Sequence, residues 1–344
     1  MILIVQRIIP HYRVSFFEEL SKKITIHLLT TAKPRVKLNL HRNSRLIILN
    51  NLNIKNFLLI NPIPYFFSDK YNSIIVESNL VFSLLYFVLL PFRGHKVVIW
   101  GSWYTKNKFA NFSRKLIHLF SKGAIFYADS HMKYFAKYTK NKNNLKVSRN
   151  TIILKERYFL DYKNLSCKKK YIIFIGKLVE RKRLVELLKI WKEIKEYSSI
   201  KKDVKLLIIG DGEYKPILRQ KILEFGLSKS VLMTGYINQD EILKKYFVRS
   251  FASISLGQVG LFAPQSMLHG VPFLCLEGSH SGGEIDNVIN GKTGFQFKSI
   301  NQLKSKLIKI INEDSYDLRK RTLNYAINNL NKKQMLEPFI YFDN

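Results

Sequence analysis

The chain has 344 residues, 47% of them hydrophobic and 13% aromatic, which is enough for about two packed domains and excludes global disorder. Lys and Arg number 57 against 25 Asp and Glu, and the formal net charge of +32 attracts polyanions: nucleic acid, an anionic membrane surface or phosphorylated small molecules. Cys167 and Cys275 lie too far apart for ligand spacing, so they exclude a disulfide scaffold or a zinc site and fit a reducing compartment.

The first residues, MILIVQRIIPHYR, predict a strand rather than a signal peptide. The longest apolar run covers residues 80–90 and is too short to span a bilayer, so we expect a buried helix there. Residues 1–150 hold 24 basic and five acidic side chains, so the front of the chain carries most of the charge excess. The abundance of Lys, Ile and Asn also fits an AT-rich genome, which accounts for part of the lysine content.

Short apolar runs alternate with helical patterns along the chain. In the first half we expect strands at 2–6, 24–29, 45–50, 73–77, 96–100 and 124–128, and helices near 14–23, 79–90, 109–121 and 131–138. In the second half we expect strands at 171–176, 205–211, 231–236, 252–257, 271–276 and 294–297, and helices near 184–197, 214–225, 240–247, 262–269, 283–289, 301–312 and 315–330. This alternation is typical of an α/β fold with parallel sheets covered on both faces.

Two runs of this kind predict two doubly wound, Rossmann-like domains, at residues 1–150 and 171–330. The charged, Asn-rich stretch between them predicts a linker at 151–170. The tail 331–344 is aromatic, so we expect it either to pack back across the junction or to form a simple terminal helix.

In open parallel sheets, ligands bind beyond the carboxyl ends of the strands. The stretch YIIFIGKLVERKRLVELL ends a strand at Gly176, and Lys177, Arg181, Lys182 and Arg183 follow just before a helix. Cations beside the free amides of a helix start suit a diphosphate. A solvated basic face is the alternative.

Glycine-containing turns follow other predicted strands. Gly210 precedes Asp211 in LLIIGDGEYKPIL, and Gly235 precedes Tyr236 in LMTGYINQDEI, where backbone groups could hold a nucleotide base. Ordinary strand-to-helix turns would look the same. The stretch GLFAPQSMLHGVPF predicts a loop, a short helix and a strand, and it contains no acidic residue. Gly260 before a helix start predicts an anion site.

Taken together, FIGKLVERKRLVELL, LLIIGDGEYKPILRQ, VLMTGYINQDEI, GLFAPQSMLHGVPFL and GGEIDNVINGKTGFQF resemble the C-terminal half of glycosyltransferase family 4 over residues 171–297. The resemblance implies the GT-B architecture, in which two Rossmann-like domains face each other across a cleft and a sugar is transferred from a nucleotide donor. The stretches QRIIPHYRVSFFEEL and KVSRNTI resemble a bacterial surface-polysaccharide subgroup of these enzymes.

The resemblance also implies roles for individual residues. It implies donor-phosphate contacts for Lys177, Lys182, Gly260 and Leu261, nucleotide or ribose contacts for Gly210, Tyr236, Ile237 and Gln265, and donor-sugar contacts for Gln258, Gly282, Gly283 and Glu284.

The sequence departs from the family pattern at several positions. The usual pair of glutamates is replaced, with Gly257 and Gln265 at those positions, so neither can place a negative charge beside the donor sugar. Gln265 can still hydrogen-bond a ribose diol through its amide. Lys177 stands where the family has Arg, and Arg183 stands where it has Gly.

The front domain is expected to bind the acceptor. His11 follows the first strand, and a histidine there can take a hydroxyl proton near neutral pH; packing against the first helix is the equal alternative. Asp129 is the rival base. Arg13 could meet a phosphate on a lipid-linked acceptor, and Trp103 offers a flat face for a sugar or belongs to the core.

Residues 105–122 place apolar side chains at helical spacing among several lysines. We expect the apolar stripe to face mostly inward and the lysines to meet anionic headgroups. The predicted location is therefore cytoplasmic, peripheral on the inner face of the cytoplasmic membrane. No D-x-D triplet occurs, and no dense cluster of metal ligands, so no metal is expected.

The sequence thus predicts a metal-independent hexosyltransferase that uses a UDP- or GDP-sugar as co-substrate and needs no other cofactor. The expected acceptor is a glycan or an undecaprenyl-linked acceptor in lipopolysaccharide, O-antigen or capsule synthesis. The alternatives are a sugar-nucleotide epimerase or an inactive nucleotide-binding scaffold. Nucleic-acid binding is disfavoured, because no stacked-aromatic motif or recognition helix is evident.

Overall fold

The computed structural model describes the chain except residues 50–51, 55–56, 60–62, 79–89, 102–106, 155–166, 198–202 and 314–315. It also leaves out the side chains of residues 51–63, Arg93 and Phe109. The chain forms two compact units. Unit 1 contains Met1–Ile153 and Lys332–Asn344, and unit 2 contains Leu154–Asn331. The last residues of the chain therefore belong to the same unit as the first.

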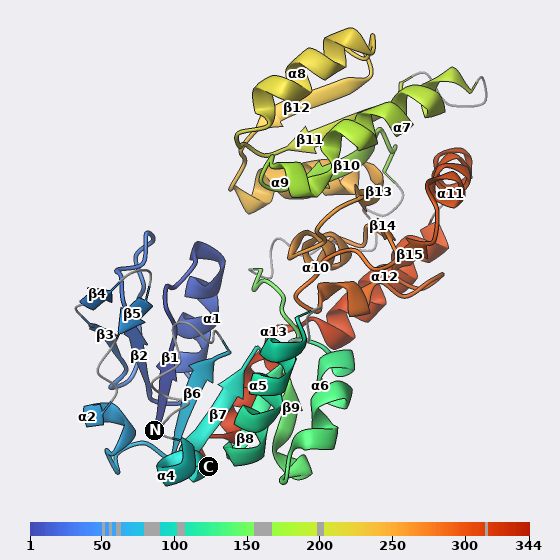
Figure 1. Cartoon of the computed structure of the whole chain (residues 1–344). Helices are drawn as coiled ribbons and strands as arrows, with labels where there is room; N and C mark the ends of the chain where they lie inside the picture. The colour runs from blue at the N-terminus through green and yellow to red at the C-terminus, as the bar shows by residue number, and fades with distance from the viewer. Residues whose placement is uncertain are drawn as a thin grey trace. The chain divides into compact units, whose positions relative to one another are not determined.

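Unit 1 is built on a parallel sheet in the order β3-β2-β1-β6-β7-β8-β9 (Figure 1). Its strands are β1 (Ile2–Val5), β2 (Ile26–Thr30), β3 (Arg45–Ile48), β6 (Ser73–Glu77), β7 (Val97–Trp100), β8 (Gly123–Phe126) and β9 (Leu145–Val147). A small antiparallel pair, β4 (Leu52–Ile54) and β5 (Phe57–Leu59), stands apart from it. From β1 the chain adds β2 and β3 on one side of the sheet and then β6 to β9 on the other side. The direction in which strands are added therefore reverses between β1 and β6.

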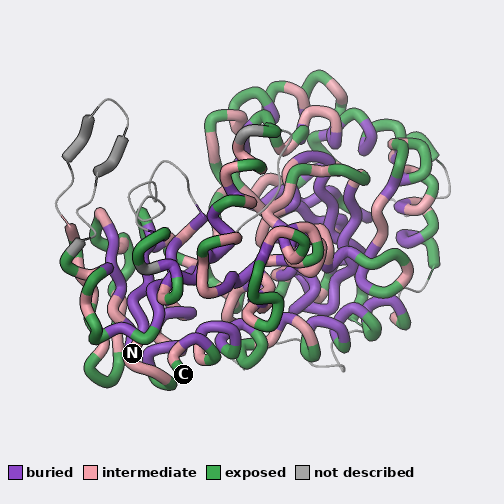
Figure 2. The backbone as a smooth tube through the Cα atoms, turned by 60° about the horizontal axis from the view of Figure 1, so that its bottom comes forward, coloured by how far each residue is buried: buried purple, intermediate pink, exposed green. Residues whose placement is uncertain are grey.

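The described helices of unit 1 are α1 (His11–Ser21), α2 (Ile63–Phe66), α4 (Leu90–Arg93), α5 (Lys108–Phe120), α6 (Asp129–Phe135) and α13 (Lys332–Tyr341). Successive strand residues point to opposite faces of a sheet. Leu3 and Val5 of β1 accordingly pack with residues of α2, α4, α5 and α6, whereas Ile2 and Ile4 pack with residues of α1 and α13. Both faces are covered, so the central strands β1, β7 and β8 are buried along their length, whereas the edge strand β3 is partly exposed (Figure 2).

Unit 2 is built on a second parallel sheet, in the order β12-β11-β10-β13-β14-β15. Its strands are β10 (Tyr171–Ile175), β11 (Lys205–Ile209), β12 (Val231–Gly235), β13 (Ser250–Ser255), β14 (Phe273–Leu276) and β15 (Gly294–Phe297). Its described helices are α7 (Leu184–Glu196), α8 (Lys215–Glu224), α9 (Asp240–Val248), α10 (Phe262–Leu268), α11 (Ile300–Asn312) and α12 (Tyr316–Asn329). In this sheet the chain adds β11 and β12 on one side of β10 and β13 to β15 on the other, so the direction in which strands are added reverses between β10 and β13.

Every strand expected from the sequence is present, with its ends shifted by a few residues. The helix expected at 283–289 is only a 3-10 turn, η7 (Glu284–Asn287), which starts behind Gly283 at a φ of +115°. The expected helix at 79–90 lies almost entirely outside the described residues. The short edge strand β9 and the β4–β5 pair were not foreseen.

The apolar stripe on α5 does not face inward as the sequence led us to expect. Phe112, Leu116 and Phe120 are exposed, at a spacing of four residues, and Phe92 of the neighbouring α4 is 71% exposed. Ile117 is the buried apolar side chain among the described residues of this stripe. The outer face of α5 in unit 1 is therefore apolar.

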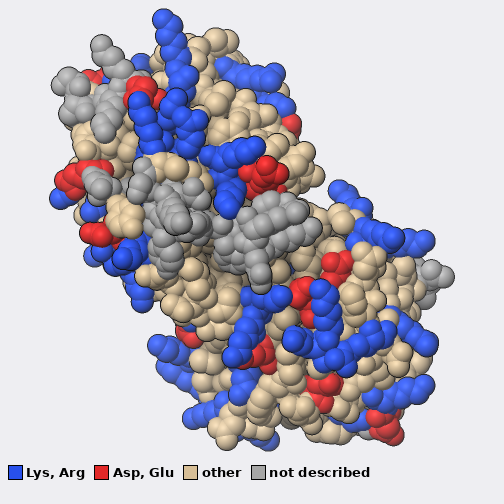
Figure 3. Space-filling view, turned by 180° about the vertical axis from the view of Figure 1, so that it is seen from behind, with Lys and Arg blue, Asp and Glu red and all other residues tan. Residues whose placement is uncertain are grey.

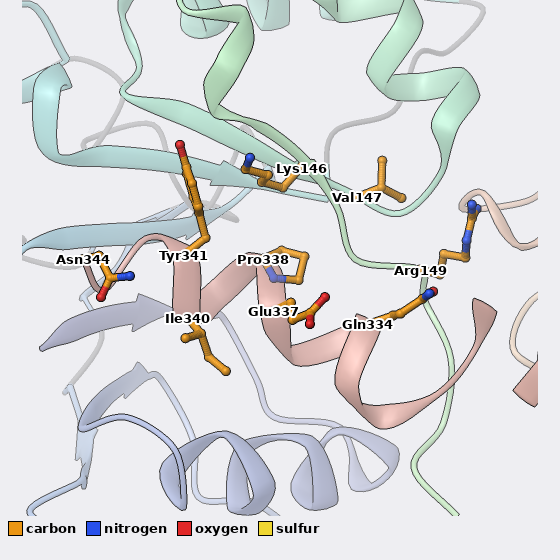
Figure 4. A pocket seen from close by; sticks show the side chains of 9 residues that line it. All are labelled: Lys146, Val147, Arg149, Gln334, Glu337, Pro338, Ile340, Tyr341 and Asn344. Atoms are coloured by element: carbon orange, nitrogen blue, oxygen red, sulfur yellow. The ribbon is translucent and has the colours of Figure 1, made fainter. Parts of the chain in front are cut away.

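Helix α13 completes the core of unit 1. The Phe339 ring is fully buried, with its centroid 4.9 Å from that of Phe16 and 4.9 Å from that of Trp100. Ser148 Oγ donates a hydrogen bond of 2.9 Å to the backbone carbonyl of Met335. Alongside β9, the C-terminal segment lines a pocket (Figure 4) formed by Lys146, Val147, Arg149, Gln334, Glu337, Pro338, Ile340, Tyr341 and Asn344.

Because Phe339 fills the space between two aromatic rings, its truncation should leave a cavity. We expect Phe339→Ala to lower the free energy of unfolding of unit 1 by about 3–5 kcal/mol. Urea unfolding measures the change, and Glu337→Ala, on the exposed face of the same helix, should change stability by less than about 0.5 kcal/mol. A loss below about 1 kcal/mol for Phe339→Ala would show that α13 does not belong to the core.

Candidate functional site

The strands of the unit 2 sheet are all parallel, so their carboxyl ends share one edge. Every candidate residue of this unit follows a strand at that edge: Lys177 and Lys182 follow β10, Gly210 follows β11, Tyr236 and Ile237 follow β12, Gln258, Gly260, Leu261 and Gln265 follow β13, and Gly282, Gly283 and Glu284 follow β14. The point where the strand order reverses, between β10 and β13, is where such sheets bind ligands.

Lys182 lies at this reversal. Its Nζ donates a hydrogen bond of 2.6 Å to the backbone carbonyl of Gln258, on the neighbouring loop. The same Nζ is 3.9 Å from where a Cβ on Gly260 would stand. The pKa of Lys182 is lowered to about 8, chiefly by burial and to a lesser extent by the charge of Arg181, while the carboxylate of Glu284 opposes both effects. A partly desolvated cation is thus held between two loops.

Glu284 supplies a carboxylate to the same edge. It is only 4% exposed. Its Oε2 accepts hydrogen bonds of 2.8 Å from Ser281 Oγ and from the backbone N–H of Gly282. Since its charge also acts on Lys182, the buried acid and the half-buried cation belong to one site.

Glycines let the loops of this edge approach closely. A Cβ on Gly210 would overlap the backbone carbonyl of Gly176, and a Cβ on Gly212 would overlap that of Leu178. Gly260 has a φ of +63°, in the left-handed region that favours glycine. The loop after β10 therefore packs directly against the loop after β11, backbone against backbone.

Gly257 lies where the structure leaves no room for a side chain. A Cβ at this position would overlap the backbone carbonyl of Arg181, and the neighbouring Gln258 N–H donates a hydrogen bond of 3.1 Å to that same carbonyl. The loops after β10 and β13 are in direct backbone contact. No side chain of any kind fits at position 257 unless these loops separate.

The side chains of several other candidate residues of unit 2 are more exposed to solvent. Lys177 is exposed at the end of β10, and Tyr236 is 64% exposed at the end of β12. Ile237, Leu261 and Gln265 are partly buried. These side chains are accessible to a ligand at the carboxyl edge.

In unit 1, His11 is the first residue of α1, exposed, with its ring edge-on to Tyr12 at 5.7 Å between centroids. Asp129 begins α6, and its Oδ2 lies 2.6 Å from Arg149 Nη2 in an ion pair. Trp103 lies outside the described residues. The Arg149 partner could not be inferred from the sequence, because it stands twenty positions after Asp129.

Arg13 lies inside unit 1 and is 4% exposed, although we expected it to meet an acceptor phosphate. Its Nη2 donates hydrogen bonds to Tyr127 Oη at 2.9 Å and to Asn150 Oδ1 at 3.0 Å. Its guanidinium carbon is 4.3 Å from the centroid of the Trp100 ring. The donors and the planar face of Arg13 are thus engaged within the unit.

Comparison with known proteins agrees with this arrangement. Residues 160–329 match the family model described as glycosyl transferases group 1, which supports glycosyl transfer. A search of curated protein sequences finds no match.

Solved structures match the chain over almost its whole length. Sucrose-phosphate synthase (tll1590) from Thermosynechococcus elongatus is 13% identical, with a TM-score of 0.72 over 99% of this chain and 97% of that one. The lipopolysaccharide outer core galactosyltransferase WaaB is 14% identical, with a TM-score of 0.69 over 99% of each chain. Anabaena Alr3699/HepE in complex with UDP is 13% identical, with a TM-score of 0.72 over 99% of this chain and 98% of that one. These similarities and the two parallel sheets confirm the GT-B fold.

The backbone contact at Gly257 can be tested by stability. We expect Gly257→Ala to destabilise unit 2 by about 1–3 kcal/mol, because the new methyl group must push two loops apart. Gly282→Ala is the matched control: its Cβ would meet only the Glu284 side chain, at 3.4 Å. Equal stability of the two variants in urea unfolding would contradict the packing described for position 257.

Proposed function

We propose that the chain is a glycosyltransferase that moves a hexose from a UDP- or GDP-sugar to a lipid-linked glycan of a bacterial surface polysaccharide. The observation that carries this proposal is the half-buried Lys182, held against the Gln258 carbonyl where the strand order of unit 2 reverses. The family match over residues 160–329 supports the reaction class. HepE in complex with UDP supports a nucleotide donor.

Lys182 and Lys177 act on the diphosphate of the donor in this proposal. A cation that is partly desolvated interacts more strongly with phosphate oxygens than one in bulk water. It therefore stabilises the negative charge that develops on the leaving nucleoside diphosphate, and no metal ion is required for that task. Free amides around Gly260 and Leu261 add hydrogen-bond donors to the same group.

The sugar and ribose are held by the neighbouring loops. Glu284 offers a carboxylate acceptor for sugar hydroxyls, in a loop shaped by Gly282 and Gly283, and Gln265 offers an amide to the ribose diol. Tyr236 is exposed at the end of β12, where a base can stack on it. In unit 1, His11 and Asp129 are the sequence-derived candidates for contact with the acceptor.

We further propose that unit 1 binds an anionic membrane surface. The exposed side chains Phe92, Phe112, Leu116 and Phe120 form an apolar patch on α4 and α5. Lys108 and Lys115 lie on α5 itself, and Figure 3 shows Lys and Arg side chains spread over the face that it draws. Aromatic side chains flanked by cations bind the headgroup region of anionic bilayers. Within the described parts of the chain, no helix has the length and apolarity needed to cross a membrane.

The donor site is tested by Lys182→Met. We expect UDP to bind about 10- to 100-fold more weakly to this variant, because a hydrogen bond to a charged group contributes about 1.5–3 kcal/mol. In the unaltered chain the affinity should fall as the pH rises through 8, where Lys182 loses its proton, and in the variant this dependence should disappear. Calorimetric titration measures both effects.

Lys189→Met, which removes an exposed lysine of α7, is the matched control and should bind UDP normally. A panel of UDP- and GDP-sugars, assayed for transfer and for hydrolysis, then tests the reaction. Full affinity and full turnover in Lys182→Met would remove the donor assignment.

The membrane patch is tested by Phe112→Ser combined with Leu116→Ser. We expect at least about tenfold less binding to vesicles containing phosphatidylglycerol, and release of the unaltered chain by high salt, which screens surface charge. Co-sedimentation measures the bound fraction. Leu223→Ser, which changes a 71% exposed leucine of unit 2, should leave binding intact. Undiminished binding by the double variant would exclude this face as the contact.

A further inference from the structure

A pocket separate from the candidate donor site opens at the opposite edge of the unit 2 sheet. Its volume is about 640 Å³, within the range of small-molecule sites, and Cys167 and Arg249 are among its lining residues. Cys167 stands shortly before β10 and Arg249 directly before β13, so the pocket lies at the amino ends of these strands. Lys182 and the loops around it follow the carboxyl ends of the same strands.

Hydrogen bonds hold the segment after Cys167 against the residues that precede β13. The backbone N–H of Lys170 donates a hydrogen bond of 2.7 Å to the carbonyl of Arg249. Lys169 Nζ donates a hydrogen bond of 3.1 Å to the carbonyl of Val248, which also lines the pocket. Cys167 itself is exposed. Its thiol is therefore accessible on the wall of a pocket whose backbone is held in place.

The pocket is positively charged. Among the described residues, its lining contains the cations Lys168, Lys244, Lys245 and Arg249 and the acid Glu241. Lys245 Nζ lies 3.6 Å from Glu241 Oε1, and the two side chains are 72% and 69% exposed. Such an exposed ion pair is weak, so it leaves the lysine available to a ligand. The surplus of cations favours a ligand that carries negative charge.

A buried guanidinium adds to this positive field. Arg319 of α12 is fully buried, and its Nη1 donates a hydrogen bond to the carbonyl of Ser250, the residue after Arg249. Among the described residues, its Nε and Nη2 have no hydrogen-bond partner. Burial lowers the pKa of Arg319 to about 10, and the charge of Cys167 opposes this shift. The guanidinium is thus charged at neutral pH and attracts a thiolate at Cys167.

The chain has one other cysteine, which cannot serve as a partner for Cys167 in a disulfide. Cys275 is fully buried in β14, and burial raises its pKa to about 12. A thiol in such surroundings is inert at neutral pH. A disulfide partner for Cys167 must therefore come from another molecule.

We propose that Cys167 is a site of S-thiolation by a small disulfide that carries carboxylates; this inference does not depend on the proposed function. The Cys167 thiolate attacks one sulfur of the disulfide, and a new S–S bond forms while the original one breaks. The displaced thiolate leaves with the electron pair of the broken bond. Cys167 is oxidised, the small disulfide is reduced, and excess thiol reverses the reaction.

The experiment compares three disulfides of different charge: glutathione disulfide is anionic, hydroxyethyl disulfide is neutral and cystamine is cationic. Intact-mass spectrometry of the full chain measures the rate of adduct formation, and peptide mapping locates the adduct. Each rate is divided by the rate of N-acetylcysteine amide with the same disulfide, which removes the disulfide's own reactivity. On this relative scale, glutathione disulfide should react with Cys167 at least about tenfold faster than cystamine, and high salt should reduce the difference.

Variants test whether the pocket causes this preference. Lys245→Gln combined with Arg249→Gln removes two exposed cations of the pocket and should lower the ratio of the two relative rates by about tenfold. Lys189→Gln combined with Lys192→Gln removes two exposed lysines of α7 and should leave the ratio unchanged. Cys167→Ser should form no adduct with any of the three disulfides.

Three results would overturn the inference. Equal relative rates for the three disulfides in the unaltered chain would mark Cys167 as an ordinary exposed thiol. An adduct on Cys275 would place the reactive thiol elsewhere. A ratio that survives the loss of Lys245 and Arg249 would show that the cations of the pocket do not select the disulfide.

Discussion

The hydrogen bond from Lys182 to the Gln258 carbonyl is the interaction on which the rest of the site depends. It joins the loops after β10 and β13 across the place where the sheet order reverses, and it holds an ammonium group in a partly desolvated position. The buried Glu284 acts on the same ammonium. A parallel sheet whose strands all end at one edge brings residues about a hundred positions apart into such a cluster.

The loops around Lys182 are held by backbone contacts that limit which side chains they can carry. Arg183 adopts the left-handed conformation, with a φ of +55°, which costs an ordinary residue about 1–2 kcal/mol relative to the right-handed one. Its guanidinium offsets part of this cost with two hydrogen bonds to Glu186, of 2.7 and 2.8 Å. Together with the closed space at Gly257, this shows how strongly the packing of these loops constrains residues 183 and 257.

Much of the fold could be predicted from the sequence, since the strands of a parallel sheet are buried on both faces and appear as uninterrupted apolar runs. Strand β9 was not predicted because it has only three residues and lies in a charged part of the sequence. The position of Phe339 between Phe16 and Trp100 could not be foreseen, because periodicity shows that a helix has an apolar face but not what covers it. Arg13 is a similar case: its neighbours Tyr127, Asn150 and Trp100 come from distant parts of the chain, so its surroundings could not be inferred from the sequence.

The central claim, that Lys182 binds the donor diphosphate, is tested most directly by proton uptake on UDP binding. At pH 8 the phosphates of UDP are fully ionised, while about half of the Lys182 side chains are neutral in the free chain. Calorimetry in buffers of different ionisation enthalpy should therefore show an uptake of about half a proton, which Lys182→Met abolishes. Binding without proton uptake, or the same uptake in the variant, would contradict the account.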